Sequence, residues 1–247
     1  MTRNLQKACP ERAFSRIIRH SRVMRIHALV GVSLLISASF IEISFAKPAG
    51  QKPDRYEDYL DLARHEKEGK DFVVEVRNRH SPGVVIAIHG GHIEAGTDEF
   101  AKSIAEPKLS YYVFKGVKPK NNRELHVTST HFNDPRVLEL VENAETVISV
   151  HGFKDESKDE ICIGGKNTQL RDAIAKDLRS AKLNLEIIAP CRSYGGDDLN
   201  NLVNRSKKHQ GVQLELSSHF RDRIEKDKQL GERIVSLIRM AIDFHER

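Results

Sequence analysis

The sequence predicts an α/β fold in which a largely parallel sheet is covered by helices on both faces. Apolar, β-branched segments alternate along the chain with amphipathic segments of helical period. The run from Val84 to Ile88 contains no polar residue, which is typical of a strand buried on both faces. The 247 residues suffice for one such domain, and they show neither an internal repeat nor a second domain.

The elements are delimited by turn residues and by the period of the apolar positions. We expect strands at 71–77, 84–88, 109–114, 125–130, 147–150, 161–163, 183–188 and 211–216. We expect helices at 56–68, 98–106, 135–143, 168–181 and 230–244. The first strand is expected at an edge of the sheet, and Thr97 and Thr168 are expected to cap the helices that follow them. A glycine- and asparagine-rich loop, 190–206, precedes the last strand, and long loops often line sites.

The loop after the strand 84–88 carries the first candidate site. His89 is followed by two glycines, which allow a sharp turn, and Glu94 lies within that turn. An imidazole and a carboxylate are thus placed at the carboxyl end of a strand, where open α/β sheets hold their sites. A histidine and a glutamate from one short loop are a typical start of a zinc site. The alternative is a surface loop with incidental polar residues, since the spacing is not that of the helical zinc-protease motif.

Other strand ends carry further polar candidates, namely His131, His151 and Glu215. Each alone is weak, because a histidine in a strand is more often a core residue and Glu215 on an alternating strand can face solvent. The carboxyl ends of parallel strands meet at one rim, so together these side chains are expected to cluster. Two histidines and one glutamate hold zinc with a position open for water, and a further carboxylate takes the proton of that water. Glu215 is the best remaining candidate for this base.

Composition and missing motifs exclude several other classes of function. The net charge of +5 is small and the charges of both signs are mixed, and there is no tryptophan, so nucleic acid is not expected as a partner. The G-x-S-x-G, G-x-x-x-x-G-K-[ST] and G-x-G-x-x-G motifs are absent from the sequence. Gly164-Gly165-Lys166 is interpreted as a turn followed by a basic residue.

The N-terminal segment is interpreted as a secretory signal peptide spanning residues 1–46. Arginines precede an apolar stretch from Ala28 to Phe45, and Ser44-Phe45-Ala46 places small residues at the −3 and −1 positions of a cut after Ala46. A transmembrane anchor is the alternative, in which Glu42 would be costly. Residues 1–23 are either an upstream extension before Met24 or a long charged region.

We therefore expect a linker at 47–54, a hydrolase domain at 55–247, and a protein that is exported to the periplasm or beyond and leaves the membrane after cleavage. Cys162 and Cys191 remain in the mature chain. An oxidising compartment would permit them to pair, but their distance cannot be predicted from the sequence.

Four motifs together resemble the poly-γ-glutamate hydrolase family. They are His89-Gly90-Gly91-His92-Ile93-Glu94-Ala95-Gly96-Thr97, Thr130-His131-Phe132, Ser149-Val150-His151-Gly152 and Gly211-Val212-Gln213-Leu214-Glu215-Leu216-Ser217. The resemblance covers roughly residues 55 to 245, with Ile88 in place of the family's usual proline. It implies a zinc carboxypeptidase-like α/β/α sandwich over a mixed, mostly parallel sheet.

The resemblance also implies roles for individual residues. His89 and Glu94 match zinc ligands, and Glu215 matches the general base. His151 is preferred over His131 as the third ligand, and His131 is then a contact to substrate or transition state. Four cationic side chains are available for the carboxylates of a polyanionic or glutamate-containing substrate: Arg136, Lys166, Arg171 and Arg192.

The resulting hypothesis is a secreted, monomeric zinc amidohydrolase that cleaves γ-glutamyl amide bonds. Two alternatives stay open at this point. One is a zinc hydrolase of another amide, such as a cell-wall peptide or an N-acyl amino acid. The other is a non-catalytic binding protein on the same fold.

Overall fold

The computed structural model describes residues 53–245, so the signal-peptide interpretation of residues 1–46 concerns a part of the chain outside the described residues. The strands are β1 (Phe72–Arg77), β2 (Gly83–Gly91), β3 (Ser110–Gly116), β4 (Thr146–Phe153), β5 (Glu160–Gly164), β6 (Glu186–Ile188) and β7 (Val212–Ser217). The helices are α1 (Tyr59–His65), α2 (Thr97–Ala105), α3 (Pro135–Glu142), α4 (Thr168–Ser180), α5 (Ser218–Lys226) and α6 (Lys228–His245), with 3₁₀ turns η1 (Asn122–Leu125) and η2 (Leu202–Asn204).

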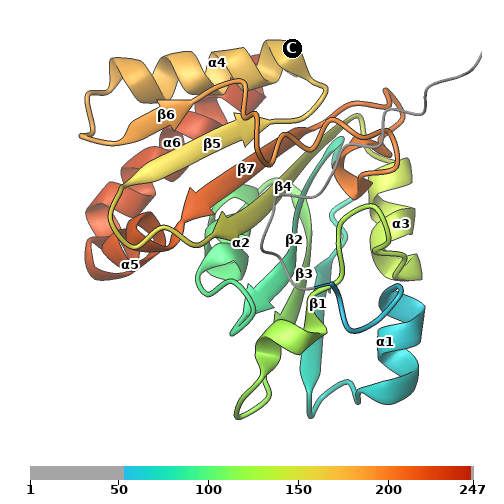
Figure 1. The fold of residues 1–247 in the computed structure, drawn as a ribbon. Coiled ribbons are helices and arrows are strands. Elements are labelled where there is room, and N and C mark those ends of the chain that lie inside the picture. The colour runs from blue at the N-terminus through green and yellow to red at the C-terminus, as the bar shows by residue number, and fades with distance from the viewer. Residues whose placement is uncertain (1–52, 246–247) are drawn as a thin grey trace, which may run out of the picture. The chain divides into compact units, whose positions relative to one another are not determined.

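The seven strands form one mixed sheet in the order β1-β3-β2-β4-β7-β5-β6, as Figure 1 shows. The four central strands β3, β2, β4 and β7 are parallel to one another. The outer strand β1 is antiparallel to β3, and β5 is antiparallel to β7. The predicted mixed, mostly parallel sheet with an edge strand at 71–77 is therefore confirmed.

Helices cover both faces of this sheet (Figure 1). The helices α2, α4 and α6 bury apolar side chains against one face, where they meet Val85, Val150 and Leu214. The helices α1 and α3 cover the other face, where they meet Ile86 and Val147. Alternate residues of each strand thus enter different cores, which explains why the central strands are apolar throughout.

The polar residues of the central strands lie on the face covered by α1 and α3. In β4 the apolar Ile148 and Val150 enter the α2/α4/α6 core, so Ser149 and His151 point to the opposite face. In β7, Leu214 and Leu216 enter the same core. Gln213 and Glu215 therefore point to the opposite face, together with Ser149 and His151. Because β4 and β7 are in parallel register, Ser149 lies opposite Gln213 and His151 lies opposite Glu215.

Some predicted boundaries are wrong. The expected strand 125–130 is absent from the described residues, because its first residue closes η1 and the rest is held by turns and side-chain contacts. The expected caps are displaced by one residue: Gly96 precedes α2 at φ +88°, and the Asn167 side chain accepts from the backbone N–H of Leu170 at the start of α4. Helix α5 was not expected; the Ser217 hydroxyl caps it by accepting from the Phe220 N–H.

No helix within residues 53–245 is long and apolar enough to cross a membrane.

Candidate metal centre

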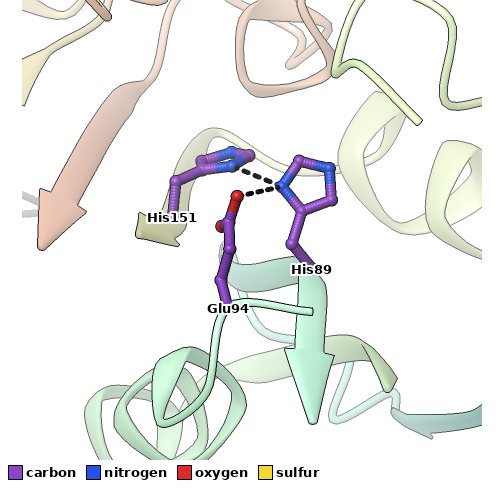
Figure 2. Close-up of side chains that lie close together, drawn as sticks. All are labelled: His89, Glu94 and His151. Atoms are coloured by element: carbon purple, nitrogen blue, oxygen red, sulfur yellow. Dashed lines mark hydrogen bonds and ion pairs between the residues drawn. The ribbon is translucent and has the colours of Figure 1, made fainter. Parts of the chain in front are cut away.

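Three buried side chains converge at the carboxyl ends of β2 and β4 (Figure 2). Each of His89, Glu94 and His151 offers one ligand-type atom, and these atoms all lie within 4.8 Å of one another. The His89 Nδ1 atom lies 3.2 Å from Glu94 Oε1 and 3.2 Å from His151 Nδ1. Donor atoms at these separations fit around one metal ion.

The turn after β2 delivers the first two of these side chains. Gly91 has φ +63°, and a Cβ there would lie 2.4 Å from the Gly116 carbonyl oxygen of β3. The turn then closes when the backbone N–H of Glu94 donates to the carbonyl of His89 at 2.8 Å. The Thr97 hydroxyl donates to the carbonyl of Glu94 at 2.8 Å. This threonine therefore stabilises the loop that carries Glu94 (the ligand loop) rather than capping the helix.

Surrounding groups orient each ligand-type atom. The Nε2 of His89 lies 2.9 Å from the Val127 carbonyl, which leaves Nδ1 directed at the centre. The second oxygen of Glu94 accepts from the Gly152 N–H at 2.8 Å, and His151 Nε2 lies 3.4 Å from the Ser129 hydroxyl. Such outer contacts fix ring orientation and tautomer at metal sites.

The electrostatics lower the pKa values of two of these groups, His151 and Glu94. Burial, reinforced by the nearby His89, lowers the pKa of His151 to about 3. Burial alone would raise the pKa of Glu94, but His89 and the other imidazoles outweigh it and hold that pKa far below its ordinary range. Metal ligands must be deprotonated, so the lowered pKa values keep Glu94 and His151 in the state that binds a cation.

The donor set fits zinc. Two imidazole nitrogens and one carboxylate oxygen are the protein ligands of catalytic zinc sites, in which a fourth position stays open for water or substrate. The residues that would hold the ion are thus His89, Glu94 and His151, as the sequence analysis expected.

Glu215 lies beside this centre, directly opposite His151 across the β4–β7 pair. Its side chain is 5% exposed, and its Oε1 accepts from Gln213 Nε2 at 3.0 Å. Burial and then the charge of Glu94 raise the pKa of Glu215 well above its usual value. A carboxyl group with a raised pKa next to a metal site has the properties of a proton-transfer residue.

His126 also lies at this site, and sequence reasoning missed it. Its ring stacks on that of His89 with centroids 4.0 Å apart, and its Nε2 lies 3.9 Å from Glu94 Oε1. Its Nδ1 lies 2.6 Å from Asp54 Oδ1, while the other oxygen of Asp54 accepts from the Thr128 N–H. Asp54 was expected at the end of a linker, so nothing in the local sequence indicated this contact.

His131 and the four expected substrate-binding cations lie outside the cluster. His131 is exposed in a turn, and its own backbone N–H donates to the Thr128 carbonyl. Arg136 pairs with Asp134 and Glu68, which ties α3 to the chain after α1. Arg171 pairs with the adjacent Asp172, and Lys166 and Arg192 are exposed. Within residues 53–245 none of these side chains hydrogen-bonds the cluster.

Two other arginines do reach the centre. Arg123 is 58% exposed and places Nη1 3.5 Å from Glu94 Oε1. Arg221 is more buried, and its guanidinium donates to the carbonyls of Ala95, Phe153 and Leu216, which lie in the ligand loop and at the ends of β4 and β7. Sequence reasoning singled out neither, because each is one charge among many in its segment.

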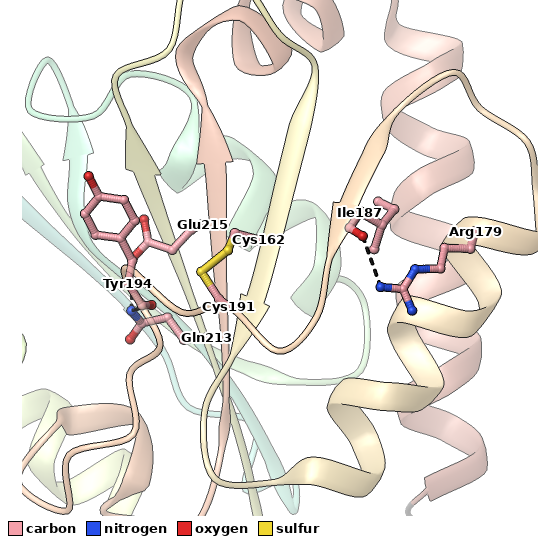
Figure 3. Close-up of a disulfide and its surroundings, with 7 residues drawn as sticks. All are labelled: Cys162, Arg179, Ile187, Cys191, Tyr194, Gln213 and Glu215. Carbon is pink, nitrogen blue, oxygen red and sulfur yellow. Dashed lines mark hydrogen bonds between the residues drawn. A yellow bond between two sulfur atoms is a disulfide. The ribbon is translucent and has the colours of Figure 1, made fainter.

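A disulfide joins Cys162 of β5 to Cys191 of the long loop (Figure 3). Cys162 lies opposite Glu215 in the β5–β7 register, so the bond anchors the loop beside the candidate base. The pairing that the sequence left open is thus present. Further along the loop, the Tyr194 ring stacks on Phe153 of β4 with centroids 5.7 Å apart.

Both the sequence and the fold of this chain are similar to those of known proteins. The sequence profile of the family described as poly-gamma-glutamate hydrolase matches residues 56–237. The UPF0714 protein YndL of Bacillus subtilis is 36% identical over 68% of this chain, and the match spans 66% of YndL, slightly under two thirds of its length. The UPF0714 protein YmaC of the same organism is 24% identical over 80% of this chain and 83% of its own.

Two solved structures are also similar to this chain. A bacteriophage poly-gamma-glutamate hydrolase superposes with a TM-score of 0.75 at 29% identity, covering 78% of this chain and 99% of its own. The structure of YndL described as apo and zinc-free gives a TM-score of 0.65 at 35% identity, covering 70% of this chain and 84% of its own.

Proposed function

Since the chain belongs to the poly-γ-glutamate hydrolase family, we propose that it is a zinc-dependent amidohydrolase that cleaves the γ-glutamyl amide bonds of poly-γ-glutamate. One observation carries the metal part of this proposal: the donor atoms of His89, Glu94 and His151 converge within 4.8 Å of one another. The similarity to a bacteriophage enzyme of that name supports the substrate.

The mechanism follows from the placement of the side chains. When bound, zinc lowers the pKa of a water molecule and polarises the amide carbonyl. His89, Glu94 and His151 would hold the ion, with their rings and carboxylate oriented by Val127, Ser129 and Gly152. Glu215 accepts a proton from the attacking water and passes it to the nitrogen of the leaving amine. Burial raises the pKa of Glu215, which makes its carboxylate a stronger proton acceptor than that of an exposed glutamate.

We also propose that the protein works outside the cytoplasm, after removal of residues 1–46. The Cys162–Cys191 disulfide supports this, because disulfides persist mainly in oxidising compartments. The N-terminal sequence of the exported protein tests this part: a mature chain that still carries Leu35 would contradict it.

The metal site is tested by zinc content, measured for the purified wild type, His151→Ala and His131→Ala, with cleavage of poly-γ-glutamate followed on the same samples. We expect about one zinc per chain in the wild type and in His131→Ala, and loss of zinc in His151→Ala. A wild type without metal would refute the hydrolase mechanism. Loss of zinc from His131→Ala alone would reassign the third ligand.

Substrate choice is tested with the same wild-type protein. Release of glutamate oligomers from poly-γ-glutamate, with no cleavage of an α-linked glutamate polymer of equal length, is the expected result. A zinc-loaded protein that leaves the γ-linked polymer intact would contradict the proposed substrate.

A further inference from the structure

We propose that Gln213 is a positioning residue that fixes the carboxylate of Glu215 for proton transfer, and that the disulfide-anchored loop in turn fixes Gln213. This inference rests on the proposed function, because it takes Glu215 as the base. Gln213 occupies β7 two residues before Glu215, so both side chains point to the same face of the sheet.

Every hydrogen-bonding group of the Gln213 amide is used (Figure 3 shows its place beside Glu215). Its Nε2 donates to Glu215 Oε1 at 3.0 Å and to the Tyr194 carbonyl at 3.0 Å. Its Oε1 accepts from Asn201 Nδ2 at 3.1 Å. The amide is 5% exposed, so these bonds form where an unpaired polar group would be costly.

These partners permit only one orientation of the amide. The carboxylate and the Tyr194 carbonyl both require a donor, whereas the NH₂ group of Asn201 requires an acceptor. Turning the Gln213 amide over would oppose oxygen to oxygen and NH₂ to NH₂. Asn201 is itself held, because its Oδ1 accepts from the Val203 N–H at the start of η2.

The loop between β6 and β7 closes around this amide. Cys191 is bonded to Cys162 of β5, and its N–H donates to the Ile163 carbonyl at 2.8 Å. Three residues later the Tyr194 carbonyl accepts from Gln213. Gly196 then packs directly on the amide: a Cβ at that position would lie 2.6 Å from Gln213 Oε1.

The consequence for Glu215 is that one oxygen is occupied and the other is available. Oε1 is bound by Gln213, and this is the only hydrogen bond that the Glu215 carboxylate makes within residues 53–245. A carboxylate held in this way presents a single oxygen in a fixed direction. Such support by a neighbouring group raises turnover rather than substrate affinity, because it acts on the proton-transfer step.

The test compares Gln213→Met, which keeps the length of the side chain and removes its donors, with the wild type on poly-γ-glutamate. We expect kcat to fall about 10- to 100-fold, which is typical for loss of an orienting partner at a metal site, with unchanged KM and zinc content. The matched control is Ser206→Ala. The Ser206 hydroxyl stabilises the same loop by donating to the Gln210 carbonyl, and within residues 53–245 it hydrogen-bonds neither Gln213 nor the residues that bind Gln213. We expect this variant to lower the melting temperature and to retain kcat.

The outcomes separate the two levels of the proposal. If the wild type cleaves the polymer and Gln213→Met does so with the same kcat, the positioning role is refuted while the proposed function stands. An equal fall of kcat in Ser206→Ala also refutes it, because a general loss of stability in the loop would then be the cause. If zinc-loaded wild type fails to cleave the polymer, the proposed function falls and this inference with it. A fall of kcat in Gln213→Met at constant KM and zinc content supports the role even where Ser206→Ala does not fold.

Discussion

Glu215 lies directly opposite His151 on the neighbouring parallel strand, so a candidate metal ligand and a candidate base share one rung of the sheet. This position has a cost, because it buries a carboxyl group close to the charge of Glu94. Burial and that charge raise the pKa of Glu215 in the folded protein, whereas its ordinary value is 4.5.

The first prediction concerns pH and stability in the presence of a metal chelator. Above pH 4.5 the unfolded chain loses the Glu215 proton while the folded chain keeps it, so each further pH unit favours unfolding by up to about 1.4 kcal/mol until the folded-state pKa is reached. Glu215→Gln removes this term. We therefore expect the variant to gain stability over the wild type as the pH rises from 4.5 to 7. Urea unfolding of both proteins across this range measures the difference, and a constant difference would contradict the prediction.

The second prediction concerns Arg221, whose guanidinium donates to the carbonyls of Ala95, Phe153 and Leu216. Replacing it with Met leaves these carbonyls without the charged donor, so we expect a loss of about 2–3 kcal/mol of stability. Arg233→Met is the control, because the exposed Arg233 makes a single 3.3 Å contact with the Ala181 carbonyl. A loss of no more than about 0.5 kcal/mol is typical for such a surface position. If the two substitutions lowered stability equally in urea unfolding, the three hydrogen bonds of Arg221 would not be the source of its contribution.

The third prediction concerns the disulfide, whose cysteines are 29 residues apart. Removing the bond frees the intervening segment in the unfolded chain, which on the chain-entropy estimate costs about 3–4 kcal/mol. We expect the double variant Cys162→Ala/Cys191→Ala to unfold at correspondingly lower urea and to lose kcat, because the loop no longer holds Gln213. Substitution is preferred to chemical reduction, since thiols also bind zinc. A variant that is less stable but keeps its full kcat would show that the disulfide is not needed to hold Gln213 in place.

The fourth prediction concerns Asp54, which binds the His126 ring and the Thr128 N–H. The segment between these residues contains Val127, whose carbonyl orients His89. Asp54→Ala should therefore weaken zinc binding, by about 10- to 100-fold if it behaves as other outer residues of metal sites. Asp71→Ala is the control, because Asp71 makes a local contact with the Lys67 N–H. Titration with a competing chelator measures both affinities, and equal values for the two variants would exclude the indirect role.

The local sequence predicted the structure correctly where a feature consists of one strand and the turn that follows it. The apolar run before His89 predicted β2, and the glycines after it predicted the turn that carries Glu94. Parallel strands meet at one rim, so His151 and Glu215 could be expected near them without knowledge of the strand order. These predictions depend on short segments, in which burial pattern and turn chemistry act together.

Contacts between distant segments could not be predicted in this way. His126 lies 72 residues from Asp54, and its own segment alternates apolar and polar residues like a strand. Only the tertiary contacts with Asp54 and His89 decide its place. The same holds for cationic side chains: the ion pairs of an arginine such as Arg136 depend on which carboxylates the fold brings to it, here Asp134 and Glu68.

Backbone pairing between β2 and β4 stops at Ile86 and Ser149, whereas His89 and His151 lie beyond that point. At the site the two strand ends are joined through side chains: the rings of His89 and His151 meet, and the Glu94 carboxylate accepts from the Gly152 N–H. An ion bound there would form a further link between β2 and β4, joining residues that are 62 positions apart in the chain. Fraying of these strand ends would then require loss of the metal. The amides of β2 and β4 near the site should accordingly exchange with solvent more slowly when zinc is present, while those at the opposite edge of the sheet keep their rates.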